Sequence, residues 1–171
     1  VCIAPAVLFM SPLLVEWVVP GSADAWAHWS FGWMFLVLLL ADDLTQYGWH
    51  RTTHTVPWLY AFHRAHHSGR YMSVRVVYRN SLPYYAFMPG LWLSAALIHL
   101  GFGPCYMVYV VLKMVVIIGA HSSVPWDEPL RKYWMTRPFM WWVTRIISTP
   151  LTHSAHHGRH RDDGVTHYKG N

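Results

Sequence analysis

The sequence has few charged residues and few cysteines for its length. Only 12% of its 171 residues are charged, while 54% are hydrophobic, and this balance is unusual for a soluble domain. Its two cysteines, Cys2 and Cys105, form no CxxC pair, which argues against a disulfide framework, a zinc ribbon and an iron–sulfur cluster. The apolar start has no basic region before it, so no cleavable signal peptide is recognisable. The composition therefore indicates an integral membrane protein.

Four apolar segments predict membrane helices, because a helix needs roughly 20 residues to cross the hydrocarbon core. They are residues 1–20, where Pro5 and Pro12 predict a kinked or partial helix, 25–47, 82–100 and 104–120. Short turns at 20–24 and 101–104 join them in pairs. We expect an all-α, integral membrane helical bundle of about four transmembrane helices in two hairpins, with a helical cap that carries clustered histidines on one side.

The positions of the basic residues predict which side that is. Twelve of the thirteen lie on the histidine-bearing side of this topology, and the turns at 20–24 and 101–104 contain none. By the positive-inside rule the histidine clusters are cytoplasmic. Topology and contact with lipid head groups account for the net charge of +5, so we expect no nucleic-acid partner. The exception is Lys113 in the last apolar segment, which is either a functional residue or a side chain that extends to the interface.

Residues 1–171 form a single membrane domain by length. The chain begins at Val1 rather than at Met, and we expect it to be a piece of a longer protein, truncated at one or both ends. An aromatic, amphipathic stretch at 133–147 contains three tryptophans, which at this density predict a position at the membrane interface.

Histidines are concentrated in three clusters that predict a metal centre. Residues 63–67 and 153–157 both have the pattern HxxHH. In a helix, residues i, i+3 and i+4 project from one face, so each of these two patterns can direct three imidazoles at one point. Pro57 and Pro150 are placed to begin the two short helices, with Thr149 as an N-cap. Eight imidazoles exceed the three or four ligands that one zinc ion takes, which implies two metals. The eight are His50, His54, His63, His66, His67, His153, His156 and His157.

Other residues are weaker candidates. His121, at the cytoplasmic end of the second hairpin, is placed to be a further ligand or an outer partner of one. His160 and His167 are possible ligands or outer partners, and Asp43 could accept a hydrogen bond that orients a ligating imidazole. The two histidines near the opposite ends of the apolar segments, His28 and His99, are interpreted as interfacial.

The histidine-bearing stretches carry a family resemblance. Residues 43–54, 62–68, 121–124 and 149–157, in this order and with a hairpin between the second and third, resemble the fatty acid hydroxylase and sterol desaturase superfamily of integral membrane di-iron enzymes. The resemblance implies that the eight clustered histidines, with His121, ligate two iron ions that react with O₂. Members commonly have AsnTyrGly after the last histidine cluster, where this chain has HisTyrLys at 167–169.

These observations lead to a functional hypothesis with alternatives. We expect a membrane oxygenase that uses a di-iron centre, O₂ and external electrons to hydroxylate or desaturate a lipid that enters from the bilayer. No haem or flavin motif occurs, so a separate reductase or redox carrier is expected to supply the electrons, and zinc could replace iron on purification. The substrate remains open among sterol, fatty acyl and related lipids. The alternatives are a histidine-rich metal transporter and a membrane zinc hydrolase, although no HExxH motif is present.

Overall fold

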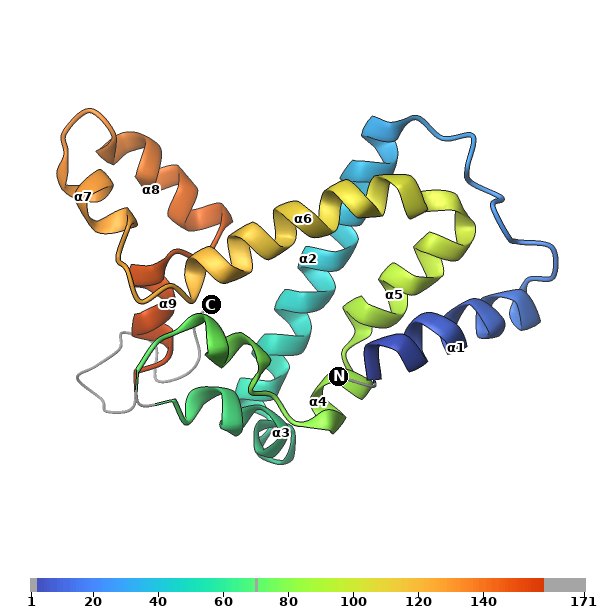
Figure 1. The fold of residues 1–171 in the computed structure, drawn as a ribbon, viewed down its shortest axis with the longest axis horizontal. Helices are drawn as coiled ribbons and strands as arrows, with labels where there is room; N and C mark the ends of the chain where they lie inside the picture. The colour runs from blue at the N-terminus through green and yellow to red at the C-terminus, as the bar shows by residue number, and fades with distance from the viewer. Residues whose placement is uncertain (1–2, 70, 159–171) are drawn as a thin grey trace. The chain divides into compact units, whose positions relative to one another are not determined.

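The computed structural model describes residues 3–69 and 71–158, and within them every regular element is a helix (Figure 1). The prediction of an all-α chain is therefore confirmed. In chain order the elements are α1 (Ile3–Val18), α2 (Phe31–Thr55), α3 (Pro57–His67), η1 (Val74–Tyr78), α4 (Leu82–Ala86), α5 (Pro89–Leu97), η2 (Ile98–Phe102), α6 (Gly103–Ala120), α7 (Asp127–Lys132), α8 (Arg137–Ile146) and α9 (Pro150–His156).

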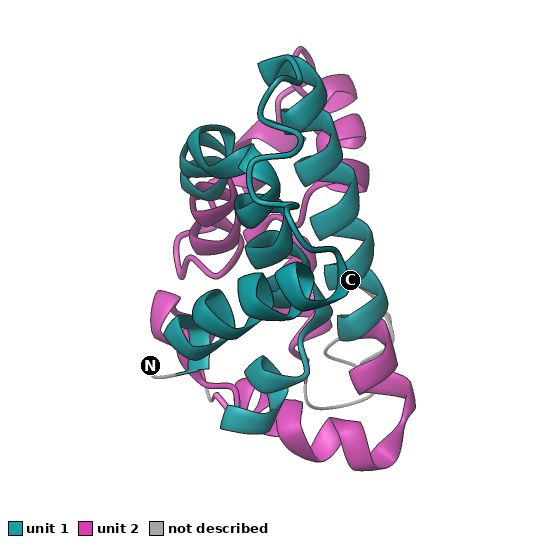
Figure 2. Ribbon diagram, turned by 90° about the vertical axis from the view of Figure 1, so that its right-hand side faces the viewer, with its two compact units in different colours: residues 1–50, 81–112 teal, residues 51–80, 113–171 magenta. Residues whose placement is uncertain are grey.

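The chain forms two compact units, which Figure 2 shows in different colours. Unit 1 comprises Val1–His50 and Ser81–Leu112, and unit 2 comprises Arg51–Asn80 and Lys113–Asn171. The long helices α2 and α6 each contain residues of both units. Of the histidines predicted to bind metal that the structure describes, His50 is the last residue of the first segment of unit 1, and the others belong to unit 2.

Unit 1 is built around an apolar core between α2, η2 and the start of α6. Leu38, Phe102 and Cys105 are completely buried there, and Tyr109 is nearly so. Helix α1 packs against α5 and is tied to it by the Ser11 hydroxyl, which donates a hydrogen bond to a backbone carbonyl of α5 at 2.9 Å. Burial of these side chains is the main force that holds the unit together.

Helix α2 continues without interruption from the apolar segment into the first histidine pair. One helix therefore carries both His50 and His54. Within α2, Asp42 is buried and accepts a hydrogen bond from the Tyr109 hydroxyl at 2.6 Å. The neighbouring Asp43, the candidate acceptor for a ligating imidazole, is exposed.

The predicted span 82–100 is divided in the structure. Helix α4 ends at Ala86, and Met88 is extended (φ −70°, ψ 108°) because a following proline disfavours the helical conformation. From Pro89 to Ala120 the chain forms the one helical run in the described residues that is long and apolar enough to cross a membrane. It is interrupted at Gly101, which has non-helical φ and ψ. The turn is thus confirmed, while the four-span arrangement stays a prediction.

Gly101 occupies a position that other residues cannot take without strain. Its φ is +111°, and a Cβ atom there would lie 2.7 Å from the backbone nitrogen of Ala27. The 19–30 loop follows the turn closely, since the backbone N–H groups of Asp24 and Trp26 donate to carbonyls of η2 at 2.9 Å. Glycine is required because the loop and the turn approach each other backbone to backbone.

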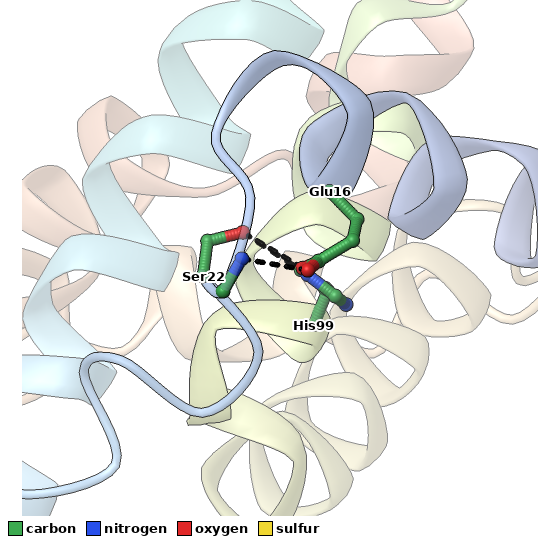
Figure 3. A network of polar contacts seen from close by, with 4 residues as sticks. Glu16, Ser22 and His99 are labelled. Atoms are coloured by element: carbon green, nitrogen blue, oxygen red, sulfur yellow. Dashed lines mark hydrogen bonds and ion pairs between the residues drawn. The ribbon is translucent and has the colours of Figure 1, made fainter.

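A polar network joins α1, the following turn and η2 in unit 1 (Figure 3). Glu16 accepts a hydrogen bond from the Gly21 N–H at 2.7 Å and a second one from the Ser22 hydroxyl. Nε2 of His99 lies 3.2 Å from both Ser22 Oγ and Glu16 Oε2. Because one nitrogen contacts both groups, the three side chains do not form a Ser–His–Glu relay, and His99 has a structural role here.

Candidate metal centre

Helix α3 brings three histidines to the interior of unit 2. The helix begins with Pro57 at its first position, after Val56 in an extended conformation, as the sequence predicted. His63, His66 and His67 are 1%, 5% and 4% exposed, although histidine is often partly exposed in proteins. Burying three neighbouring imidazoles costs free energy unless their ring nitrogens have polar or metal partners inside the unit.

Helix α9 contributes the second HxxHH pattern. A capping box between Thr149 and Thr152 fixes its start, and Pro150 follows at the first helical position as predicted. His153 and His156 are 7% and 2% exposed. His157 is the C-cap and keeps a helical conformation, so the three imidazoles share one side of the short helix.

One group of ring nitrogens converges near the end of α2. A nitrogen from each of His54, His63 and His67 lies within 4.8 Å of the others, and the Nε2 atoms of His63 and His67 are 3.1 Å apart. The His156 ring lies beside this group, 4.7 Å from His54 and 4.8 Å from His67 between centroids. His50 precedes His54 by four residues on α2 and so lies on the same side of that helix.

A second group converges on His121, at the end of α6. Nε2 of His121 lies 2.9 Å from Nε2 of His153 and 3.3 Å from Nε2 of His66. Nε2 of His157 lies 3.1 Å from that of His153, and all four residues are candidates for one metal ion. The rings of His67 and His157 stack at 4.2 Å, so the two groups are neighbours within unit 2.

Hydrogen bonds on the outer side explain why the Nε2 atoms point inward. Nδ1 of His66 lies 2.8 Å from the carbonyl of Val76, and Nδ1 of His121 lies 2.8 Å from the carbonyl of Ile117. A carbonyl only accepts, so each Nδ1 carries the proton and each neutral ring has a bare Nε2. Lone pairs that face one another at about 3 Å repel, and a cation between them removes that repulsion. The donor set therefore fits metal ions.

The surroundings keep these imidazoles neutral. Burial lowers the pKa of His67, and the nearby rings of His157, His63, His156 and His54 lower it further. Burial likewise lowers the pKa of His121, and burial together with the neighbouring rings lowers the pKa of His153 well below its ordinary value. Metal binding requires the neutral form of histidine. Both groups therefore contain imidazoles in the protonation state that binds a metal cation.

The outer shell includes a residue that the sequence analysis missed. Asn80, just after η1, places its amide oxygen 2.7 Å from Nδ1 of His63. Nothing in the spacing of the histidines indicates it, because it follows His63 by 17 residues. The one available signal was a polar residue in the segment that follows the first HxxHH pattern in the sequence.

The remaining candidates are placed as follows. His160 and His167 lie outside the described residues, and Asp43 and His28 are exposed in unit 1.

Beside α9, a cavity of about 410 Å³ opens in unit 2. The described residues that line it are uncharged and include Ser122, Ser123, Leu151 and Ser154.

Comparisons with known proteins place the chain in a family. Residues 35–170 match the profile of the family described as fatty acid hydroxylase. The chain is also 26% identical over 139 residues to an alkylglycerol monooxygenase from Danio rerio, an alignment that covers 77% of this chain and 26% of the relative. The chain thus matches about a quarter of that relative's length. No solved structure matches.

Proposed function

Because the chain belongs to the fatty acid hydroxylase family, we propose that it is the metal-binding part of a membrane-bound, O₂-dependent lipid hydroxylase with a two-iron centre. The observation that carries the proposal is the convergence of imidazole nitrogens, most of them from buried residues, in two adjacent groups. Imidazole is a suitable ligand for iron and also for zinc, copper and nickel, so the family rather than the ligand type favours iron.

In this proposal the chain's own residues hold, orient and shield the metals. His54, His63 and His67, with His50 and His156, serve one ion, and His66, His121, His153 and His157 serve the other. When bound, the iron pair supplies the oxidising power that attack on an unactivated C–H bond requires. The fixed proton on Nδ1 of His66 and of His121 keeps their Nε2 atoms available as ligands.

The proposed reaction is hydroxylation. One oxygen atom of O₂ enters the C–H bond of a lipid, and the other leaves as water after two electrons and two protons are added. The relative's name, alkylglycerol monooxygenase, makes an ether-linked alkylglycerol the first substrate to test. Sterols and fatty acyl lipids, and desaturation in place of hydroxylation, are further outcomes of that test. A separate reductase or redox carrier would supply the electrons.

The proposed location is an integral membrane one, with the histidine clusters on the cytoplasmic side. The apolar run Pro89–Ala120 supports membrane association. Exposed aromatic side chains of α8, among them Trp141 and Trp142, suit a membrane interface. In such a position lipid chains reach the metals directly from the bilayer.

The test uses the full-length protein, purified without oxygen, and measures iron per chain together with ¹⁸O incorporation into lipids. We expect two iron ions per chain, and a product whose new oxygen comes from ¹⁸O₂. The variant His156→Ala should lose both metal and product, because its ring is 2% exposed and lies in the cluster. The exposed His28→Ala variant is the matched control and should keep both.

Other outcomes of this experiment would identify the rival functions. Fewer than two metals per chain, or an O₂-independent product, would exclude the proposed oxygenase. A bound zinc with hydrolytic activity would point to a hydrolase, although both candidate groups in the described residues consist of histidine alone and offer no carboxylate base. Metal uptake into vesicles without lipid oxidation would point to a transporter.

A further inference from the structure

The segment from Val74 to Asn80 packs against α3 through η1. It binds one histidine from each candidate metal group: the Val76 carbonyl lies 2.8 Å from Nδ1 of His66, and the Asn80 amide oxygen lies 2.7 Å from Nδ1 of His63. Val76 is 3% exposed, so the segment is packed against the unit rather than loosely attached. Residues 74–80 therefore act on both groups at once.

The two anchors differ in chemical kind. His66 is held by a backbone carbonyl, as is His121, and no side-chain substitution removes such a partner. His63 is held by a side chain, and the ring itself is 1% exposed. If the amide were removed, the buried Nδ1–H of His63 would lose its acceptor, and the ring could change its tautomer or turn over. Either change would move the bare lone pair away from the metal.

We propose that Asn80 is a positioning residue that sets the metal affinity of the site formed by His54, His63 and His67, without affecting the site around His121. The proposal rests on the proposed two-metal function. Outer partners of metal-bound histidines typically change metal affinity by roughly 10- to 100-fold. The neutral amide orients His63 without adding a charge to the buried cluster, which a carboxylate would do.

The experiment is a metal titration of the full-length protein in lipid nanodiscs. Bound metal is removed with a chelator, and Co²⁺ is then added back in competition with a chromophoric chelator. The wild-type protein should bind two ions. In Asn80→Leu we expect one site to weaken roughly 10- to 100-fold and the other to keep its affinity. Asn80→Asp, which still offers an oxygen, should retain both sites.

A matched control comes from the same segment. Ser73 precedes η1 and makes no capping hydrogen bond with its side chain, so Ser73→Ala should titrate like the wild type. Size-exclusion chromatography and thermal unfolding of metal-free protein check that each variant is folded. If Asn80→Leu does not fold, Asn80→Ser replaces it, because its hydroxyl is too short to reach His63.

Two backgrounds identify which site responds. In His153→Ala the site around His54 is the one that remains, and Asn80→Leu should lower its affinity. In His54→Ala the site around His121 remains, and Asn80→Leu should leave it unchanged. Two wild-type sites that Asn80→Leu leaves equally strong would overturn the role of Asn80. Fewer than two sites in the wild type would instead overturn the two-metal function, so the two failures are distinguishable.

Discussion

At the scale of single residues, the buried imidazoles make stability depend on pH. The folded protein keeps His67, His121 and His153 neutral because burial lowers the pKa of each. In the unfolded chain these residues regain the ordinary histidine pKa of about 6.5. Below that pH the unfolded state binds more protons than the folded state, so protons favour unfolding.

We therefore expect the metal-free protein to lose stability as the pH falls from 7.5 to 5.5. Each histidine that remains neutral in the folded state costs about 1.4 kcal/mol per pH unit once the pH lies below 6.5. Thermal unfolding across this range measures the effect, and His153→Ala should reduce the slope. The Ser73→Ala variant, which removes no titratable group, should leave the slope unchanged. A stability that is constant or rises on acidification would contradict a neutral cluster.

Gly101 gives a prediction that is independent of metals. Gly101→Ala forces a side chain into a φ of +111° and against the backbone of Ala27, so we expect a loss of about 2 kcal/mol or more in unfolding free energy. Chemical unfolding in detergent measures it. Gly103→Ala is the control, because nothing lies within 4 Å of its Cβ position; an equal loss in both variants would disprove the argument.

Where the signal was local, the sequence singled out residues that the structure brings together, and where the contact depends on the fold it did not. The two HxxHH patterns led directly to histidines that the structure buries together. The candidate acceptor Asp43 stays a prediction, and the buried carboxylate beside it, Asp42, was not predicted because burial depends on the partners of α2. Asn80 was missed because its contact with His63 depends on how the chain returns after η1.

At the scale of elements, helix starts were the most predictable features. Pro57 and Pro150 begin α3 and α9 as expected. Proline fits the first position of a helix because the backbone N–H that it lacks would have no hydrogen-bond acceptor within the helix there. Interruptions inside apolar segments were less predictable. The break at Met88 was missed because an apolar composition alone does not distinguish one long helix from two short ones.

The start of α9 carries a prediction about metal binding through a residue that is not a ligand. Thr149→Ala removes one half of the capping box with Thr152, which should destabilise α9 by about 1 kcal/mol. Because His153 and His156 lie in this helix, metal retention against a chelator should fall with it. Thr149→Ser should restore retention, and Thr144→Ala in α8 is the control. Unchanged retention in Thr149→Ala would show that α9 is positioned by other contacts.

At the scale of the whole molecule, two long helices link the units. Helices α2 and α6 each have apolar residues in unit 1 and continue into unit 2, where the histidine groups are found. This arrangement accounts for a chain that has a membrane protein's composition and yet concentrates polar ligands in a few segments. The number of spans and the side of the histidine groups stay predictions, since the first rests on the apolar segments and the second on the distribution of basic residues.

Sidedness can be tested with a matched pair of small, exposed residues. Ala23 lies in the turn without basic residues, and Ser123 follows His121 by two positions. If the positive-inside rule holds, a cysteine at position 23 should react with a membrane-impermeant maleimide from outside sealed cells or vesicles, and a cysteine at position 123 only after permeabilisation. The background is Cys2→Ser with Cys105→Ala, and Ala23→Cys and Ser123→Cys are compared in it. Labelling of both from the same side would show that the hairpin topology is wrong, even if the metal centre is present.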